Sequence, residues 1–369
     1  MAKRKTRGPA PIYAKRLVHC RREMKKHRVG AYLVSNDMDY FYLTGFTGED
    51  SALLILPRAV HLLSDGRFDE AINQECPWVR RWMRRGTLNA EIAKASEELK
   101  IRTLAVQAER FTLADEAEVK KANRSTKLRS APSILADMRI KKDDNEVALI
   151  RKSIRVAEEA FRATCAAIKV GQTELEIAAR IEYEMKRRGA RGPSFPTICA
   201  EGPNAALPHA HPGKRKVKRG SAVLLDWGAR LGNYCSDLTR VVFVGSIPRK
   251  IREVYPIVLE AQKRAIAAVK PGARMCDVDE VARKYITEAG YGKEFNHGLG
   301  HGMGLDIHEA PSLSWRSSAK LEAGMVVTVE PGVYLPGIGG VRIEDDMLVT
   351  PNGSRFLTQL PRRLEDAVI

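Results

Sequence analysis

The sequence predicts a mixed α/β (α+β) protein of two domains, and three observations support this prediction. Over roughly the first 130 residues, short apolar runs of strand type alternate with amphipathic stretches of helical type. The charged sequence RIKKDDNE, near Met138–Asn145, then interrupts the alternation and has no apolar periodicity. Beyond it, one order of elements occurs twice: a long helix, a glycine-bearing break, a second helix and a β-rich stretch.

The first domain is expected to span residues 12–138, after a basic tail at residues 1–10. Helical patterns are predicted at Tyr13–His27, Arg67–Cys76, Asn89–Leu99 and Leu113–Asn123. Strand patterns are predicted at Gly30–Ser35, Ala52–Ile55, Val60–Leu63, Trp78–Trp82 and Thr103–Val106. The stretch contains no phosphate-binding loop and no nucleotide-binding glycine pattern, so a compact α/β domain without a nucleotide site is expected.

The second domain is expected to span residues 144–355 and to open with a long helix. Asp144 or Asn145 is the predicted N-cap of this helix, and Gly171 is predicted to end it. Thr173 is predicted to begin the next helix, with Glu176 completing a capping box.

An internal repeat subdivides this second domain. The sequence AAIKVG at 166–171 is echoed by AAVKPG at 267–272, and Gly189 and Gly290 pair at the same offset. Because the order of elements repeats as well, we expect two half-domains related by a pseudo-two-fold axis.

Bulk composition limits the classes of function that need consideration. No apolar run approaches the roughly 18 residues of a membrane helix, and no apolar signal segment follows the basic N-terminus. The six scattered cysteines contain no CxxC pair, which is typical of reduced thiols in a cytoplasmic protein. The net charge of +17 would suit nucleic acid, but no zinc-finger, RRM-type or basic-zipper pattern accompanies it. A solvated basic surface is therefore the preferred interpretation.

The stretch Asn296–Pro311, NHGLGHGMGLDIHEAP, concentrates three of the eight histidines of the chain: His297, His301 and His308. Histidine titrates near neutral pH and is the commonest metal ligand. Four glycines separate these histidines, so the backbone is expected to approach a ligand closely or to adopt positive φ.

Four carboxylates lie in or beside apolar β patterns: Asp226, Asp237, Glu330 and Glu344. A buried charge must be paired or bound to a metal, and one of these acids could pair with Arg240 or Arg342. Four acids with a glycine-framed histidine are better explained by a metal site of hard, oxygen-rich ligands, suited to Mn²⁺, Co²⁺ or Zn²⁺. More acids than one ion needs indicate two ions that share bridging carboxylates.

Six motifs along the chain now indicate a family: SFPTICAEGPNAALPH, LLDWGA, YCSDLTR, HGLGHGMGLDIHE, TVEPGVY and GVRIEDD. In this order and spacing, the chain from about Leu17 to Val349 resembles the creatinase-like, pita-bread metallopeptidases, specifically the Xaa-Pro aminopeptidase and Xaa-Pro dipeptidase (prolidase) branch. The resemblance implies an N-terminal creatinase-like domain followed by a pita-bread catalytic domain. It also implies a cytoplasmic, homodimeric exopeptidase that acts on Xaa-Pro peptides with two divalent metal ions, Mn most readily and Co or Zn as alternatives.

The resemblance also implies roles for individual residues. Five would be metal ligands: Asp226, Asp237, His301, Glu330 and Glu344. Asp237 and Glu344 would bridge the two ions, and Glu330 would also be the general base that takes the proton of a metal-bridging water or hydroxide.

The other histidines receive separate roles by the same resemblance. His209 and His308 would contact the scissile carbonyl or the tetrahedral intermediate, and His297 would help to hold the substrate. Arg342 would be the arginine beside the metal ligands, in contact with substrate or with a carboxylate. His211 has no such counterpart and is expected to be an exposed histidine.

Three alternatives stay open at this point. The sequence does not decide between aminopeptidase and dipeptidase, since that choice depends on loop geometry around the substrate's carboxyl end. A small non-peptide amide could be the substrate, as in ectoine hydrolase-like relatives. A catalytically silent basic binding protein is the remaining alternative, although the complete ligand set argues against it.

Overall fold

The computed structural model describes residues 8–369, and the chain divides into two compact units with their sequence boundary between Met138 and Arg139. Residues 1–7 of the predicted basic tail lie outside the described part. Within residues 8–369, no helix is long and apolar enough to cross a membrane. The two units are described separately below.

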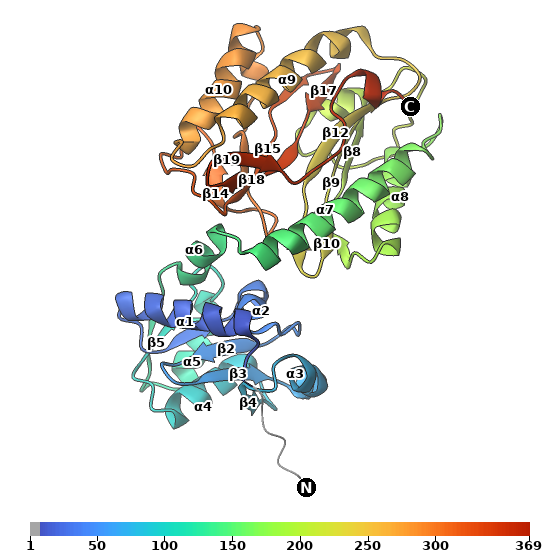
Figure 1. Ribbon diagram of the computed structural model, residues 1–369. Coiled ribbons are helices and arrows are strands. Elements are labelled where there is room, and N and C mark those ends of the chain that lie inside the picture. The colour runs from blue at the N-terminus through green and yellow to red at the C-terminus, as the bar shows by residue number, and fades with distance from the viewer. Residues whose placement is uncertain (1–7) are drawn as a thin grey trace. The chain divides into compact units, whose positions relative to one another are not determined.

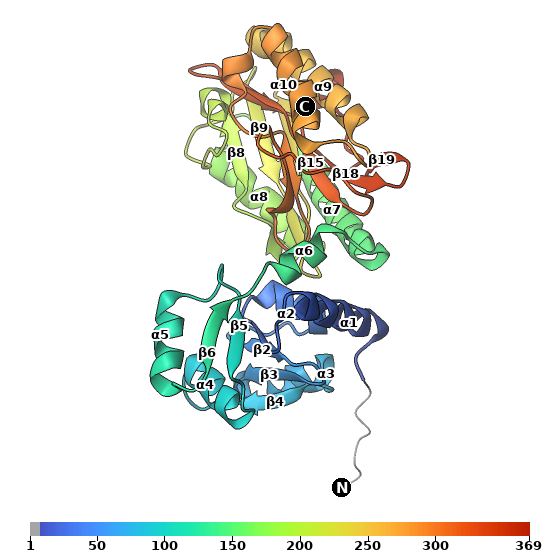
Figure 2. The same cartoon turned by 90° about the vertical axis from the view of Figure 1, so that its left-hand side faces the viewer.

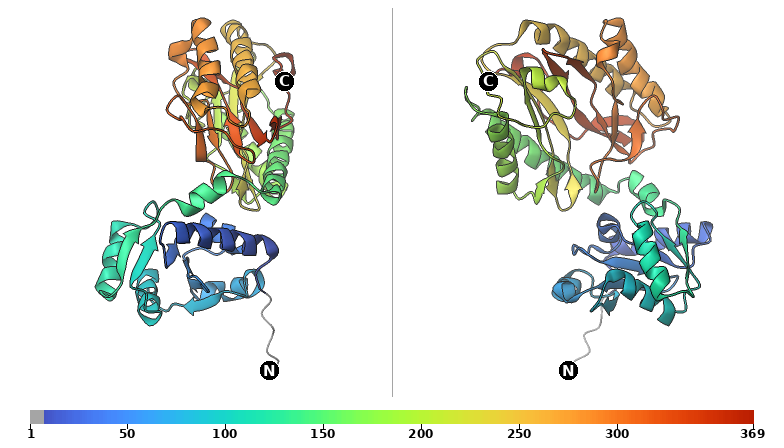
Figure 3. Two further views of the ribbon diagram at one scale, coloured as in Figure 1. Left: turned by 60° about the vertical axis from the view of Figure 1, so that its left-hand side comes forward. Right: turned by 180° about the vertical axis from the view of Figure 1, so that it is seen from behind.

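The first unit is built on a six-stranded sheet whose strand order is β4-β3-β2-β1-β5-β6. Its strands are β1 (Tyr32–Val34), β2 (Ala52–Ile55), β3 (Val60–Ser64), β4 (Arg80–Met83), β5 (Thr103–Val106) and β6 (Lys127–Ser130). Its helices are α1 (Pro11–Lys26), α2 (Asp37–Thr44), α3 (Asp69–Glu75), α4 (Leu88–Glu98), α5 (Leu113–Ala122) and α6 (Ile134–Ile140), the last of which crosses the boundary. In Figures 2 and 3, α1 and α2 lie along one face of the sheet and α4 and α5 along the other.

Every helix and strand predicted for the first unit is present, but α2, β6 and α6 were not predicted. Helix α2 is short, and its apolar residues do not form a stripe of helical period. Local signals define it instead: the Asn36 side chain accepts a hydrogen bond from the Met38 amide, and Gly45 ends the helix with a φ of 79°.

The second unit repeats one arrangement of elements twice. Helices α7 (Asp144–Cys165) and α8 (Glu174–Arg187) lead into strands β7 (Gly192–Pro193), β8 (Ile198–Glu201), β9 (Ala222–Trp227), β10 (Ala229–Leu231), β11 (Tyr234–Cys235) and β12 (Leu238–Phe243). Helices α9 (Arg249–Ala268) and α10 (Met275–Glu288) lead into β13 (Gly300–Gly302), β14 (Glu309–Leu313), β15 (Val326–Val329), β16 (Gly332–Leu335), β17 (Gly339–Arg342), β18 (Asp345–Thr350) and β19 (Gly353–Phe356). Figure 1 shows each helix pair side by side, α7 with α8 and α9 with α10.

Backbone geometry supports the internal repeat. Gly171 and Gly272, which hold equivalent places in the two copies, have φ values of 94° and 83°. Gly189 and Gly290, the next equivalent pair, have φ values of 95° and 87°. Side chains other than glycine rarely adopt this left-handed conformation, so each copy requires a glycine at both breaks.

The predicted N-cap of α7 was wrong by one residue. Asp143, rather than Asp144 or Asn145, accepts hydrogen bonds from the amides of Asn145 and Glu146. The Asp143 amide in turn donates a hydrogen bond to the Glu146 carboxylate at 3.1 Å, which completes a capping box. At α8, the predicted capping box of Thr173 and Glu176 is present.

Strand β9 is buried on both of its faces. Val223, Leu225 and Trp227 pack with the core of α7 and α8, whereas Ala222 and Leu224 pack with the core of α9 and α10. Because side chains alternate along a strand, Asp226 shares the face of Ala222 and Leu224. This alternation directs the Asp226 carboxylate toward the second half-domain.

Candidate metal centre

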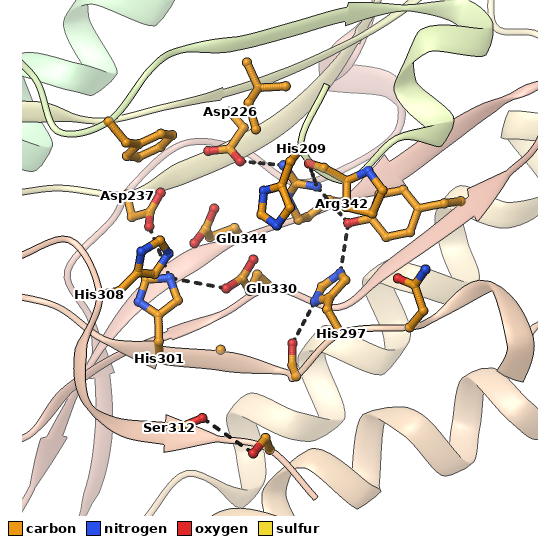
Figure 4. A pocket seen from close by; sticks show the side chains of 18 of the residues that line it. His209, Asp226, Asp237, His297, His301, His308, Ser312, Glu330, Arg342 and Glu344 are labelled. Carbon is orange, nitrogen blue, oxygen red and sulfur yellow. Dashed lines mark hydrogen bonds and ion pairs between the residues drawn. The ribbon is translucent and has the colours of Figure 1, made fainter. Parts of the chain in front are cut away.

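One cavity of about 630 Å³ brings together every site residue predicted from the sequence. Its lining includes Asp226, Asp237, Glu330, Glu344, His209, His297, His301, His308 and Arg342. In Figure 4, the four carboxylates point from separate parts of the chain into one common space beside the His301 ring.

The four carboxylates come from both half-domains, two from each. Asp226 lies within β9, and Asp237 directly precedes β12, which pairs with β9 in antiparallel register. Glu330 directly follows β15, and Glu344 occupies the short break between β17 and β18.

A compact group of donor atoms forms where these elements meet. One ligand atom from each of Asp237, His301 and Glu344 lies within 4.8 Å of the others. His301 Nε2 is 3.4 Å from Asp237 Oδ2 and 3.4 Å from Glu330 Oε1. His301 Nδ1 lies 3.1 Å from the Gly302 carbonyl, so that nitrogen carries the proton and Nε2 presents its lone pair to the carboxylates. This tautomer is the one that a metal-binding histidine requires.

Two buried oxygen atoms of this cluster have no hydrogen-bond partner among the described residues, Asp226 Oδ1 and Glu344 Oε1. A buried acceptor without a partner is costly, and two carboxylates in this condition beside a neutral imidazole form a hard oxygen-and-nitrogen donor set. The residues present therefore fit a divalent metal ion.

The acid cluster is electrostatically unfavourable without a cation. Burial raises the pKa of Asp237 well above its usual range, and repulsion from Glu344 adds to that shift. Burial likewise raises the pKa of Glu344, and it raises the pKa of Glu330 to about 8. The pKa of His301 falls to about 4, chiefly through burial, which keeps this imidazole neutral.

A testable dependence of stability on pH follows from these shifts. With divalent ions removed by a chelator, the free energy of unfolding should fall as pH rises. The pKa of Glu330 is raised from 4.5 to about 8 in the folded protein, so its stabilising contribution is complete below pH 4.5 and is lost as pH passes about 8. Thermal melts at about pH 7, 7.7 and 8.5, with chelator or with excess Mn²⁺, would measure this, because above pH 7 the buried His297 and His301 are neutral in both the folded and the unfolded protein. A chelated protein whose melting temperature is constant or rises across this interval would contradict it.

Arg342 organises one side of the acid cluster. The residue is 3% exposed, and its guanidinium forms an ion pair with Asp226 and donates to the Tyr334 hydroxyl at 2.7 Å. It also donates at 3.1 Å to the Thr239 hydroxyl, which in turn donates to Glu344 Oε2 at 2.6 Å. Arg342 therefore fixes one oxygen of Asp226 and, through Thr239, one oxygen of Glu344. The free oxygens of both acids are left facing the donor group.

The histidines around the cavity occupy different environments. His297 is enclosed: Nδ1 lies 2.7 Å from the Gly298 carbonyl and Nε2 lies 2.9 Å from the Tyr334 hydroxyl, while burial lowers its pKa to about 4. His308 is exposed, and its ring centre is 4.3 Å from that of His301. His209 and His211 are exposed at the cavity as well, and an exposed position is what the sequence predicted for His211.

The structure gives a different reason for the glycines between the histidines from the one that the sequence predicted. None of Gly298, Gly300, Gly302 and Gly304 has positive φ. A Cβ atom at Gly300 would lie 2.1 Å from the Thr328 carbonyl oxygen, and one at Gly302 would lie 2.4 Å from the Ala310 carbonyl oxygen. These two glycines are required by the close approach of β13 to neighbouring chain segments rather than by a ligand.

Several residues of the site were not predicted from the sequence. Glu309, which follows His308, accepts from Lys142 Nζ and from Arg139 Nη2 at 2.6 Å each. Both cations are almost completely buried, so this cluster anchors the segment that carries His308. Trp315 and Arg316 also line the cavity. No pattern of spacing in the sequence marks these residues, because their partners lie far away along the chain.

Comparison with known proteins relates this site to characterised families. Residues 148–351 match the model of metallopeptidase family M24, and residues 16–141 match the creatinase/prolidase N-terminal domain. An Xaa-Pro dipeptidase of Pyrococcus horikoshii is 45% identical over 247 residues, covering 67% of this chain and 70% of that protein.

Two solved structures share the fold over almost the whole chain. An Xaa-Pro dipeptidase from Bacillus anthracis is 35% identical with a TM-score of 0.92, covering 97% of this chain and 100% of that one. An X-Pro aminopeptidase from Thermotoga maritima is 38% identical with a TM-score of 0.87, covering 94% and 100%. The α/β architecture predicted from the sequence, an N-terminal domain before a pita-bread catalytic domain, is confirmed.

Proposed function

The chain belongs to metallopeptidase family M24, and on this premise we propose that it hydrolyses the peptide bond between an N-terminal residue and a following proline, with a preference for dipeptides. The observation that carries the proposal is the convergence of four carboxylates and a neutral histidine in one cavity. The similarity to Xaa-Pro dipeptidases supplies the substrate class.

We assign the metal ligands as the sequence predicted them: Asp226, Asp237, His301, Glu330 and Glu344. These residues would hold two divalent ions, to both of which Asp237 and Glu344 would contribute, and Mn²⁺ is the expected metal with Co²⁺ or Zn²⁺ as substitutes. The orphaned oxygens of Asp226 and Glu344 support it, as does the lone pair of His301 Nε2.

When bound, the ions supply polarisation of the scissile carbonyl and activation of the attacking water. Glu330 takes a proton from that water as its oxygen bonds to the carbonyl carbon. It then delivers the proton to the proline nitrogen as the carbon–nitrogen bond breaks. Thr328 donates to Glu330 Oε1 at 3.3 Å and so restrains the carboxylate in this role.

The histidines act on the substrate in this proposal. His308 and His209, both exposed at the cavity, donate to the oxygen that gains negative charge in the tetrahedral intermediate. His297 already uses both ring nitrogens, so it shapes the cavity wall against the substrate and orients Tyr334. Arg342 holds Asp226 and Tyr334 in place and lines the cavity in which the substrate binds.

The preference for dipeptides rests on Arg316. This arginine lines the cavity, is exposed, and forms no ion pair with another residue of the described range 8–369. In an Xaa-Pro dipeptide, the free carboxylate is attached to the carbon next to the scissile nitrogen. An unpaired guanidinium in the cavity is suited to bind that carboxylate through two parallel hydrogen bonds.

The decisive assay compares Xaa-Pro dipeptides with Xaa-Pro-Xaa tripeptides under Mn²⁺, Co²⁺ and Zn²⁺. Arg316→Ala should raise KM for dipeptides by about 10- to 100-fold with a smaller effect on kcat, since a charged hydrogen bond is lost. Arg249→Ala is the matched control, because Arg249 has a side chain 97% exposed and does not line the cavity. Cleavage of tripeptides as efficient as that of dipeptides, or an unchanged KM in Arg316→Ala, would contradict the proposed preference for dipeptides. Hydrolysis of small non-peptide amides alone would replace the proposed function.

The homodimer expected from the family stays a prediction. Size-exclusion chromatography with light scattering would test it on the purified chain.

A further inference from the structure

Trp315 is an exposed aromatic residue in the wall of the cavity that holds the candidate metal ligands. Among the large apolar residues that are exposed in the described range 8–369, Trp315 alone lines this cavity, and the residue is 46% exposed. A tryptophan that is left this exposed forgoes much of the stabilisation that burial would give, so a ligand that covers it gains that stabilisation on binding.

The indole is held in place by Arg283. The Arg283 guanidinium carbon lies 4.5 Å from the centre of the Trp315 ring, and that of Arg316 lies 5.4 Å away. Arg283 is itself fixed by two hydrogen bonds to Asp279, at 2.8 and 2.9 Å. Asp279 is completely buried and accepts a further bond from the Leu299 amide at 3.0 Å. The cationic support of the indole therefore belongs to a rigid network.

The same arginine connects Trp315 to the segment that carries His297. Arg283 donates to the Phe295 carbonyl at 3.0 Å and to the His297 carbonyl at 2.7 Å. A Cβ atom at Gly298 would lie 3.1 Å from the Cβ of Ser314, the residue that precedes Trp315. Trp315 thus stands beside the His297 wall of the cavity, and one side chain of α10 sets the position of both.

We propose that Trp315 is the specificity-determining residue for proline, forming the wall of the subsite that receives the prolyl ring, and that Arg283 is its positioning residue. This inference rests on the proposed Xaa-Pro specificity. In a prolyl residue, the apolar ring and the carboxylate are attached to one carbon. Trp315 and Arg316 are consecutive and both line the cavity, so an indole and a guanidinium are available together for those two groups. The three ring methylenes of proline would cover apolar surface that an alanyl residue leaves exposed.

The test compares kcat/KM for leucyl-proline and leucyl-alanine in the Mn²⁺-loaded protein. Trp315→Ala should lower the value for leucyl-proline by about 10- to 50-fold and that for leucyl-alanine by less than about 3-fold, which is the range for lost methylene contacts. Trp315→Phe should retain most of the preference. Arg283→Lys keeps the positive charge but loses the paired N–H donors of the guanidinium. It should lower the proline-to-alanine ratio, which is kcat/KM for leucyl-proline divided by kcat/KM for leucyl-alanine, by about 3- to 10-fold with unchanged metal content.

Tyr183→Ala is the matched control for these variants. Tyr183 is an exposed aromatic residue of the same unit with Arg180 5.8 Å from its ring centre, and it does not line the cavity. In Tyr183→Ala, the ratio of kcat/KM for leucyl-proline to kcat/KM for leucyl-alanine should equal that of the unmodified protein. Titration of free proline should also change tryptophan fluorescence in the unmodified protein and not in Trp315→Phe, which gives a readout independent of turnover.

The outcomes separate this inference from the function on which it rests. An unmodified protein that cleaves no Xaa-Pro substrate overturns the proposed function and the inference together. An active protein in which Trp315→Ala keeps the proline-to-alanine ratio overturns the inference alone. A variant that loses preference for the N-terminal residue, leucyl-proline against glycyl-proline, but keeps the proline preference assigns Trp315 to the other subsite and also overturns it.

Discussion

Asp237→Ala and Glu344→Ala are each expected to abolish peptidase activity, lowering kcat/KM by at least about 10³-fold, and to deplete bound metal. Each carboxylate supplies a donor atom to the compact group around His301, and each is assigned to both ions. One substitution would therefore leave two ions short of a ligand. Metal content by mass spectrometry and steady-state kinetics would measure the two effects on the same preparation.

Loss of fold can be distinguished from loss of metal in these variants. Asp237 and Glu344 repel each other, so the metal-free Asp237→Asn protein should be at least as stable near pH 8 as the metal-free unmodified protein. Glu201→Gln serves as the control, since Glu201 is a buried acid that lies outside the cavity lining and accepts a hydrogen bond from Ser221. It should retain metal and activity. Full activity with two ions bound in either alanine variant would refute the bridging assignment.

His308→Ala is expected to reduce kcat by about 10²-fold or more while metal content stays near normal, by analogy with the loss of an oxyanion donor. His308 is exposed at the cavity, and the group of metal donors contains His301 instead. Kinetics and metal analysis would be run beside His211→Ala, a second exposed histidine at the same cavity that is assigned no role. Depletion of metal in His308→Ala would make His308 the ligand, and unchanged turnover would exclude it from catalysis.

The candidate site could be predicted from the sequence because each of its acids is conspicuous locally. Asp226 and Glu330 stand in or directly after apolar strand patterns, where a charge is costly, and this signal does not depend on the fold. The histidines are concentrated in one segment. The structure adds contacts between residues that are far apart in the sequence, which no local pattern could predict. These are the ion pair of Arg342 with Asp226 and the link from Arg342 through Thr239 to Glu344.

The failures of prediction also have physical causes. Helix α2 depends on one side-chain cap and one glycine rather than on a periodic apolar stripe, so pattern reading missed it. The N-cap of α7 was misplaced by one residue because several acidic or amide side chains follow one another there, and only the reciprocal contact with Glu146 selects Asp143. Trp315 and Arg283 are 32 positions apart, and nothing in either local sequence indicates that they meet.

The division of the acids between the two half-domains has a consequence for the biosynthesis of the protein. Asp226 and Asp237 are translated roughly a hundred residues before Glu330 and Glu344, so a ribosome-bound chain carries an incomplete site until the last strands have emerged. Tight metal capture thus requires that nearly the whole catalytic unit has been synthesised and folded. The chain therefore lacks a complete metal site, and with it peptidase activity, until the catalytic unit has folded.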